Sequence, residues 1–290
     1  RIGTAGIITN EYNHILLIQR DDTRTWCEPG GSLEFGRLPT DNVAQEVREE
    51  TGMIVMPVRL VALHHWNISP DGGLSFIFRC LIRGGELTPS PESPQVGFYP
   101  SDQLPRPILD FHQQSINDGW HHKGGPPIFR KRSPSFRTML VRLLLTTVIY
   151  PFKNLRLRLN GEKYTPPPQW ELTVAVVAQD EDGRILWQNE NETAVLPHGR
   201  PQSPAEAPWE TAARLIKAQT GQTATITDLP LVVVTKDTNH ITLIFSTHLP
   251  TSSEPTFTPA PPPNANPLHI SFLKDALNSQ EETIFRYDTP

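Results

Sequence analysis

The stretch Trp26–Met53, WCEPGGSLEFGRLPTDNVAQEVREETGM, decides how the first part of this 290-residue chain folds. Its glycines predict a loop, and the segment that follows has the periodicity of a short amphipathic helix. The apolar face of that helix is Val43, Ala44 and Val47, which we expect to pack on a core. Gly52 stands where a helix ends in the left-handed conformation. The sequence therefore predicts a glycine-rich loop running into a helix that ends at Gly52.

Three acids lie on the other face of this predicted helix. Glu46, Glu49 and Glu50 are spaced i, i+3 and i+4, so their carboxylates project from one side. Like charges at this spacing destabilise an isolated helix by about 0.2–0.5 kcal/mol per pair. Mg²⁺ and Mn²⁺ prefer carboxylate oxygens and bridge them to phosphates, so a metal site explains the arrangement. A solvated acidic helix is the alternative interpretation.

Residues 31–53 resemble a Nudix box, whose pattern is G-x5-E-x7-R-E-U-x-E-E-x-G-U with U a bulky aliphatic residue. With Gly31 as the first glycine, the chain matches at Glu46, Val47, Glu49, Glu50, Gly52 and Met53. It departs at Arg37, where the pattern has Glu, and at Gln45, where it has Arg. The resemblance implies an α+β fold, a Nudix-type α/β/α sandwich with a mixed β-sheet. It also implies a hydrolase that splits a pyrophosphate bond with activated water.

The resemblance assigns roles to four residues of the box and its loop. Mg²⁺ or Mn²⁺ is expected to be held by Glu46, Glu49 and Glu50, with the backbone carbonyl of Gly30 as a further ligand. Glu46 and Glu49 are the expected catalytic residues, Glu46 as a metal ligand or as the base that activates water. The two departures from the pattern leave open whether activity is retained, reduced or retuned.

Three further residues are candidates for substrate contacts. Trp26 precedes the loop and either stacks on a base or belongs to the core, the commoner fate of such a Trp. Glu34 is placed to supply the carboxylate missing at position 37. Arg37 is expected to pair with Glu34 or Glu46, or to put a positive charge where a cation should bind. Glu92, in a later loop, is a weaker candidate for an additional acid.

Composition limits the function classes. A length of 290 residues predicts two domains, and a net charge of −5 does not suggest a general nucleic-acid binder. Cys27 and Cys80 form no CxxC pair, so neither a disulfide framework nor a zinc site is indicated, and a reducing cytoplasm is expected. No signal peptide is visible at the start of the chain.

The chain repeats part of its pattern roughly 170 residues later, as a whole-domain duplication does. Two strands around a turn are predicted in Ile7–Ile18 and again in Val174–Trp187. Aligning Thr220–Gly221 with Thr51–Gly52 puts Arg214 at the consensus Arg, and Leu215, Ala218 and Gln219 at the places of the three acids. A later segment, Ile270–Leu277, echoes Val96–Leu104. The second copy is thus expected to lack metal ligands.

The predicted organisation is a Nudix-like hydrolase domain at 1–125, a basic, partly helical linker at 126–168 and a degenerate Nudix-like domain at 169–290. Between His121 and Thr165 there are ten Lys or Arg residues and one acid. The apolar run 139–150 contains Arg142 and is shorter than the roughly 20 residues that a transmembrane helix needs, so no membrane span is predicted. A helix docked on a domain, an anionic membrane surface and a phosphate-rich or RNA ligand remain alternatives for this segment.

Three functions fit the sequence: a metal-dependent pyrophosphohydrolase, a module that binds a nucleotide derivative without cleaving it, and a scaffold. The intact acids favour the first, and Arg37 with Gln45 favours the second. The expected partner is a nucleotide-type small molecule of undetermined identity. The second copy is expected to form an intramolecular pseudo-dimer with the first, or the chain forms a homodimer.

Overall fold

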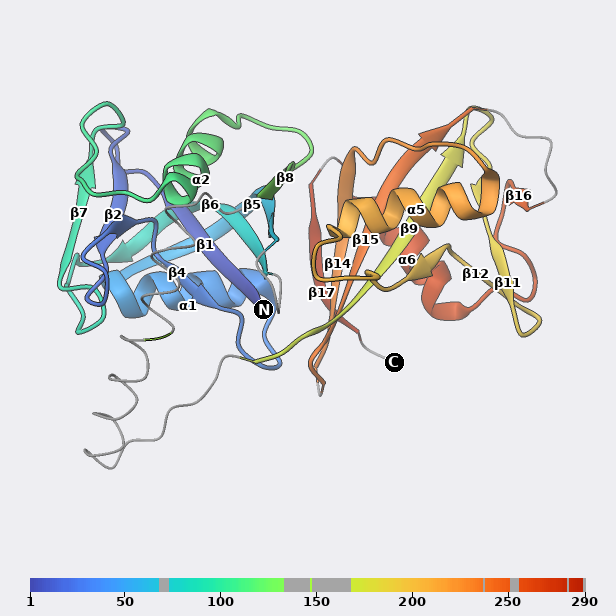
Figure 1. The fold of residues 1–290 in the computed structure, drawn as a ribbon, viewed down its shortest axis with the longest axis horizontal. Coiled ribbons are helices and arrows are strands. Elements are labelled where there is room, and N and C mark those ends of the chain that lie inside the picture. The colour runs from blue at the N-terminus through green and yellow to red at the C-terminus, as the bar shows by residue number, and fades with distance from the viewer. Residues whose placement is uncertain are drawn as a thin grey trace.

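The chain folds into two halves that lie side by side, with the N-terminal half in blue to green and the C-terminal half in yellow to red (Figure 1). The computed structural model describes residues 1–67, 73–132, 147, 168–236, 238–250, 256–280 and 282–288. The apolar run 139–150, apart from Thr147, and most of the predicted linker lie outside the described residues.

The N-terminal half is built on a mixed five-stranded sheet. In spatial order its strands are β4 (Gly30–Ser32), β1 (Ile2–Ile8), β6 (Gly73–Gly85), β5 (Met53–Trp66) and β8 (Ile128–Arg132). The pairs β1–β6 and β5–β8 are parallel, whereas β4–β1 and β6–β5 are antiparallel. A separate three-stranded sheet contains β3 (Trp26–Cys27), β2 (Ile15–Gln19) and β7 (Gln95–Tyr99).

Two helices cover opposite faces of the first sheet, α1 (Pro39–Thr51) and α2 (Asp110–His121). Successive residues of a strand point to opposite faces. Ile8 accordingly packs in the cluster that contains Val43 of α1, and Ile7 packs in the cluster that contains Ile116 of α2. The α/β/α sandwich with a mixed sheet is therefore confirmed.

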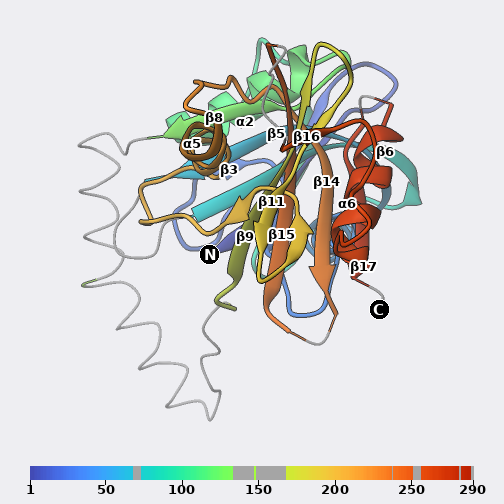
Figure 2. The same ribbon diagram turned by 90° about the vertical axis from the view of Figure 1, so that its right-hand side faces the viewer.

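The C-terminal half contains a second mixed sheet with α5 (Pro208–Thr220) and α6 (Pro267–Leu277) on opposite sides (Figure 2). Its strands are β16 (Phe257–Thr258), β10 (Ile185–Leu186), β9 (Glu171–Asp180), β15 (His240–Leu249), β14 (Asp228–Thr235) and β17 (Ile284–Asp288), in that spatial order, with β13 (His198–Gly199) also paired to β9. A small hairpin joins β11 (Gln188–Glu190) to β12 (Thr193–Val195).

The two large sheets share one sequence of strand directions. The order β13-β9-β15-β14-β17 has the same antiparallel, parallel, antiparallel and parallel pairings as β4-β1-β6-β5-β8. The helices α1 and α5 both begin with Pro and end at a left-handed Gly, with φ of 73° at Gly52 and 70° at Gly221. This correspondence supports duplication, which stays a prediction.

The two strands around a turn predicted in Ile7–Ile18 are confirmed, although they belong to different sheets and meet through one bridge, Thr9 to Ile15. Two other details differ from the sequence-based expectations. The echo between Val96–Leu104 and Ile270–Leu277 is wrong, because the first lies in β7 and the turn after it and the second lies in α6. The linker predicted from residue 126 includes β8, which instead completes the first sheet. Cys27 and Cys80 are free and buried. Within the described ranges, no helix is both long and apolar enough to cross a bilayer.

Candidate active site

The candidate site lies where the turn at Gly30 and Gly31 meets α1. Gly30 approaches β1 so closely that a Cβ atom there would lie 2.2 Å from the carbonyl oxygen of Thr4. A Cβ atom on Gly31 would lie 2.4 Å from Oε2 of Glu46. Gly30 therefore requires glycine, because a side chain there would displace the β1 backbone, whereas a side chain at Gly31 would displace only the end of the Glu46 side chain.

Glu50 is held against this turn. Its Oε2 accepts a hydrogen bond of 2.8 Å from the backbone N–H of Gly30, and the residue is 9% exposed. Burial raises the pKa of Glu50 to about 8, the Gly30 N–H and Arg20 act against that shift, and repulsion from Glu46 and Glu92 adds to it. At neutral pH this carboxyl group keeps its proton unless a cation lies beside it.

Glu46 is the second carboxyl group at the turn. Burial, followed by repulsion from Glu49, Glu34 and Glu92, raises the pKa of Glu46 to about 7, while Arg37 acts in the opposite direction. Glu92 raises the pKa of both Glu46 and Glu50, so it is the fourth acid of this region. A crowded group of carboxylates with raised pKa values is the electrostatic condition that a divalent cation relieves.

Glu49 does not join the other two acids. Its side chain is exposed, and its Oε1 accepts a hydrogen bond of 2.5 Å from the side-chain amide of Gln45. Among the residues that the structure describes, no three His, Cys, Asp or Glu side chains already converge on a common metal position. The three acids therefore lie in different settings: Glu50 is buried at the turn, Glu46 is half-buried beside Gly31, and Glu49 is exposed and bonded to Gln45.

The residue that departs from the box pattern at position 37 has a local partner. Nε of Arg37 lies 3.2 Å from Oε2 of Glu34, so these two candidate substrate contacts form an ion pair at the edge of the loop. Glu34 also donates its backbone N–H to Oδ1 of Asn42, at 3.0 Å. The guanidinium group is therefore engaged with Glu34, the first of the two partners expected from the sequence.

A cavity of about 140 Å³ lies beside the Gly30–Gly31 turn. Trp66 and Phe111 line it and contact each other edge to face, with ring centroids 4.5 Å apart. Arg20 also lines it, and Nε and Nη2 of Arg20 hold the two carboxylate oxygens of Asp22 at 2.9 and 2.8 Å. The cavity thus combines aromatic walls with a guanidinium group next to the acids.

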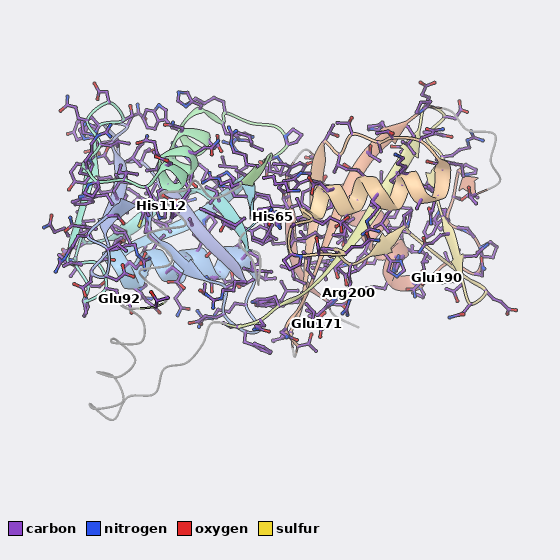
Figure 3. The ribbon with its side chains drawn as sticks, viewed as in Figure 1. His65, Glu92, His112, Glu171, Glu190 and Arg200 are labelled. Carbon is purple, nitrogen blue, oxygen red and sulfur yellow. The ribbon has the colours of Figure 1, made fainter. Side chains whose placement is uncertain are left out.

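Glu28 and His112 face each other across this cavity. Oε2 of Glu28 lies 3.0 Å from Nδ1 of His112, and Glu28 is 5% exposed. Glu28 belongs to the stretch Trp26–Met53, directly before Pro29, and is not among the site residues predicted from the sequence. His112 comes from α2, 84 residues away, and no motif marks it. Figure 3 labels His112 within the N-terminal half.

A buried polar network supports the wall of the cavity. Nε2 of His64 lies 3.0 Å from Oδ2 of Asp118, and the hydroxyl of Ser115 lies 3.3 Å from Nδ1 of the same ring. Arg130 donates two hydrogen bonds of 2.5 Å to Asp118. Burial raises the pKa of Asp118, but these hydrogen bonds outweigh it and hold that pKa below its usual value. The network fixes α2 to β5 and β8.

Trp26, a candidate from the sequence, and the two adjacent histidines of β5 lie in different environments. Trp26 is buried in the core, edge to face with Tyr99 at 5.1 Å, which corrects the expectation that it contacts substrate. His64 and His65 point to opposite faces of β5, as strand alternation requires. His64 lines the cavity, whereas His65 lies at the boundary between the two halves (Figure 3).

Comparison with known proteins gives a consistent result for the N-terminal half. The family model described as "NUDIX domain" matches residues 1–118. A "MutT-like protein" of Streptomyces ambofaciens is 35% identical over 117 residues, which are 40% of this chain and 75% of that protein. An "ADP-ribose pyrophosphatase" of Methanocaldococcus jannaschii is 30% identical over 132 residues, 43% of this chain and 75% of that protein.

A solved structure of an ADP-ribose pyrophosphatase from Streptococcus suis is also similar. It is 26% identical, with 45% of this chain and 98% of that chain covered and a TM-score of 0.38.

Proposed function

Because this chain belongs to the NUDIX family, we propose that its N-terminal half hydrolyses the pyrophosphate bond of a nucleoside diphosphate linked to another moiety. The cofactor is Mg²⁺ or Mn²⁺. The observation that carries the proposal is the pair Glu46 and Glu50, pressed against a glycine turn with pKa values raised to about 7 and about 8. Perturbed carboxyl groups next to a cavity mark a functional site.

Glu46, Glu50 and the backbone carbonyl of Gly30 would hold the cation, and Glu49 would join them after leaving Gln45. When bound, the cation would neutralise charge on the phosphoryl groups and make a water molecule a better nucleophile. Glu46 would accept the proton of the attacking water, a role that requires its ionised form. Glu92 is the second candidate for this role, and its support is that its charge raises the pKa of both Glu46 and Glu50.

One ring of the nucleoside, its base or its sugar, occupies the cavity of about 140 Å³ beside the turn. Trp66 and Phe111 offer aromatic surface to that ring, and Glu28 offers a buried acceptor. In this proposal the phosphates are bound by guanidinium donors of Arg20 other than the two that Asp22 engages. The identity of the second moiety is set by loops outside this cavity.

Glu28→Gln is expected to raise KM about tenfold with little change in kcat, because a hydrogen bond to a charged acceptor contributes about 1.5–3 kcal/mol. Steady-state kinetics on the preferred substrate gives both constants. Glu86→Gln is the matched control, since this substitution removes the same charge from an exposed side chain. An unchanged KM in Glu28→Gln would contradict a role for Glu28 in binding.

A non-catalytic nucleotide-binding function is the second candidate. Its support is the exposed Glu49, whose carboxylate is engaged by the side-chain amide of Gln45. Gln45→Ala removes that hydrogen bond, and we expect Mn²⁺ to bind about two- to fivefold more tightly, in line with the small net value of one hydrogen bond. Isothermal titration calorimetry measures the change. Weaker Mn²⁺ binding in this variant would mean that Gln45 orients Glu49 as the consensus Arg does.

Release of phosphate-containing products from ADP-ribose, dinucleotides and nucleoside triphosphates, with and without Mg²⁺ or Mn²⁺, separates the two candidates. Metal-dependent turnover of any of these compounds supports hydrolysis. Binding of a nucleotide derivative without turnover in either metal supports the second function and overturns the first.

We further propose that residues 169–290 are a degenerate copy that does not hydrolyse substrate. Leu215, Ala218 and Gln219 stand on α5 where α1 carries its three acids. The side-chain amide of Gln219 donates a hydrogen bond to Gln188, and neutral side chains do not gather a divalent cation as carboxylates do.

The two buried free thiols, Cys27 and Cys80, suit the reducing, cytoplasmic setting expected from the sequence.

A further inference from the structure

The two halves meet through aromatic contacts that are repeated with the halves exchanged. Phe78 of β6 packs on Phe285 of β17, with ring centroids 5.3 Å apart. Phe245 of β15 packs on Phe129 of β8, with ring centroids 5.6 Å apart. All four rings lie in, or pack against, one apolar cluster that includes residues from both halves.

The phenylalanines of the two contacts occupy corresponding strands of the two halves, β8 with β17 and β6 with β15. Phe129 pairs with Leu63 in the parallel ladder β5–β8, and Phe285 pairs with Val232 in the parallel ladder β14–β17. In a two-fold interface, a contact between position i of one unit and position j of the other is repeated between position j of the first and position i of the second. The C-terminal half therefore lies where a second subunit lies in a two-fold dimer.

The C-terminal half also holds the loop of the candidate active site. Nε1 of Trp170 donates to the carbonyl oxygen of Leu33 at 3.2 Å, and the hydroxyl of Tyr287 donates to the carbonyl oxygen of Gly36 at 3.2 Å. The rings of Phe35 and Trp170 lie 6.1 Å apart. Two donors from separate segments of the second half thus hold two successive parts of one loop.

From the opposite side, Asn42 of α1 holds the same loop. Its Oδ1 accepts the backbone N–H of Glu34, and its Nδ2 donates to the carbonyl oxygen of Ser32 at 3.3 Å. The loop carries the Glu34–Arg37 ion pair and follows directly on the Gly30–Gly31 turn, where Gly31 lies against the Glu46 carboxylate. The position of the loop therefore sets where these two charges lie relative to the first catalytic carboxyl group.

We propose that Trp170 and Tyr287 are positioning residues of the N-terminal active site, so that the C-terminal half completes the hydrolytic site without doing chemistry. This inference rests on the proposed hydrolase function. The second half acts as a covalently attached subunit whose partner surface is the loop 33–36. It contributes no ligand and no proton acceptor to the reaction.

The test is the full-length double variant Trp170→Phe/Tyr287→Phe, which removes both donors and keeps both aromatic rings. Trp209→Phe with Tyr12→Phe is the matched control. Trp209 stacks on Phe129 at the same interface, at 5.2 Å, and Tyr12 is 71% exposed. Hydrogen–deuterium exchange of the peptide covering 32–38 and steady-state kinetics are measured on both proteins.

In the double variant we expect exchange of the loop amides to rise about 30-fold, the equivalent of two lost hydrogen bonds of about 1 kcal/mol each. We also expect kcat to fall about tenfold with KM changed less than twofold, whereas the control keeps native values. A purely structural role of the two donors would lower the unfolding temperature but leave kcat and loop exchange unchanged.

Two results overturn the proposal: native loop exchange in the double variant, or faster loop exchange with native kcat. Restoration of kcat by the single reversion of either residue supports it. If the natural chain shows no turnover at all, the hydrolase function fails, and loop exchange still decides whether the second half holds the loop.

Discussion

Glu50→Gln is expected to lower kcat/KM about 10³-fold while the protein stays folded, because charge stabilisation by a bound metal contributes several kcal/mol and each 1.36 kcal/mol is a factor of ten. The glutamine keeps an oxygen that accepts the Gly30 N–H and removes the negative charge. The substitution also removes a buried carboxyl group whose ionisation is unfavourable, so stability is expected to stay level or increase.

The measurement is kcat/KM at saturating Mn²⁺, together with the Mn²⁺ dissociation constant and the unfolding temperature. Glu11→Gln serves as the control, because Glu11 is exposed and outside the site. Glu49→Gln is expected to cost less than Glu50→Gln, since Glu49 is exposed and engaged by Gln45. Turnover that survives both Glu46→Gln and Glu50→Gln would remove the carboxylate mechanism.

Local signals explain why the sequence predicted the helix that carries the box acids. Its apolar face and its end at Gly52 depend on residues within one short segment. The loop before it is marked by its glycines, and Gly30 is required because the backbone of β1 lies so close to it. The end of α5 at Gly221 has the same left-handed glycine.

Contacts between distant segments were not predictable in the same way. Glu28 meets His112 only because α2 folds across the sheet, and the sequence places these residues 84 positions apart. Trp26 looked equally suited to a core and to a substrate site until its contact with Tyr99 in the core was known. The rotation of Glu49 toward Gln45 is a side-chain choice that spacing on a helix does not determine.

Strand pairing is the other limit. The two strands in Ile7–Ile18 have the pattern of a hairpin, yet β1 pairs with β4 and β6, and β2 pairs with β3 and β7. Hydrophobic alternation identifies a strand and its buried face but not its neighbours. The resemblance of Ile270–Leu277 to Val96–Leu104 failed for a related reason, because short apolar segments suit both a helix and a strand.

The stability of the metal-free protein is expected to fall as pH rises from about 4.5 to about 8. Glu46 and Glu50 have ordinary pKa values of 4.5, and their folded pKa values are raised to about 7 and about 8. A carboxyl group with a raised folded pKa binds its proton more tightly in the folded state than in the unfolded state. Its contribution is therefore present at low pH and is lost as pH rises through the folded pKa. Thermal unfolding in EDTA at several pH values measures this loss, and Glu50→Gln is expected to reduce it.

Mn²⁺ binding is expected to show the opposite dependence and to strengthen about 10²- to 10³-fold between pH 6 and pH 9, because metal ligands must lose their protons first. Below pH 7 both Glu46 and Glu50 retain protons that the cation has to displace, whereas above pH 8 both are ionised. Calorimetry in buffers of different ionisation enthalpy counts the protons released. We expect between one and two at pH 6.5 and close to none at pH 9. Because Glu50→Gln leaves a single titrating ligand of this pair, its proton release should not exceed one. Equal Mn²⁺ affinity at pH 6 and pH 9 would show that these two carboxyl groups do not hold the metal, and the site would then have to be sought around Glu49 and Glu92.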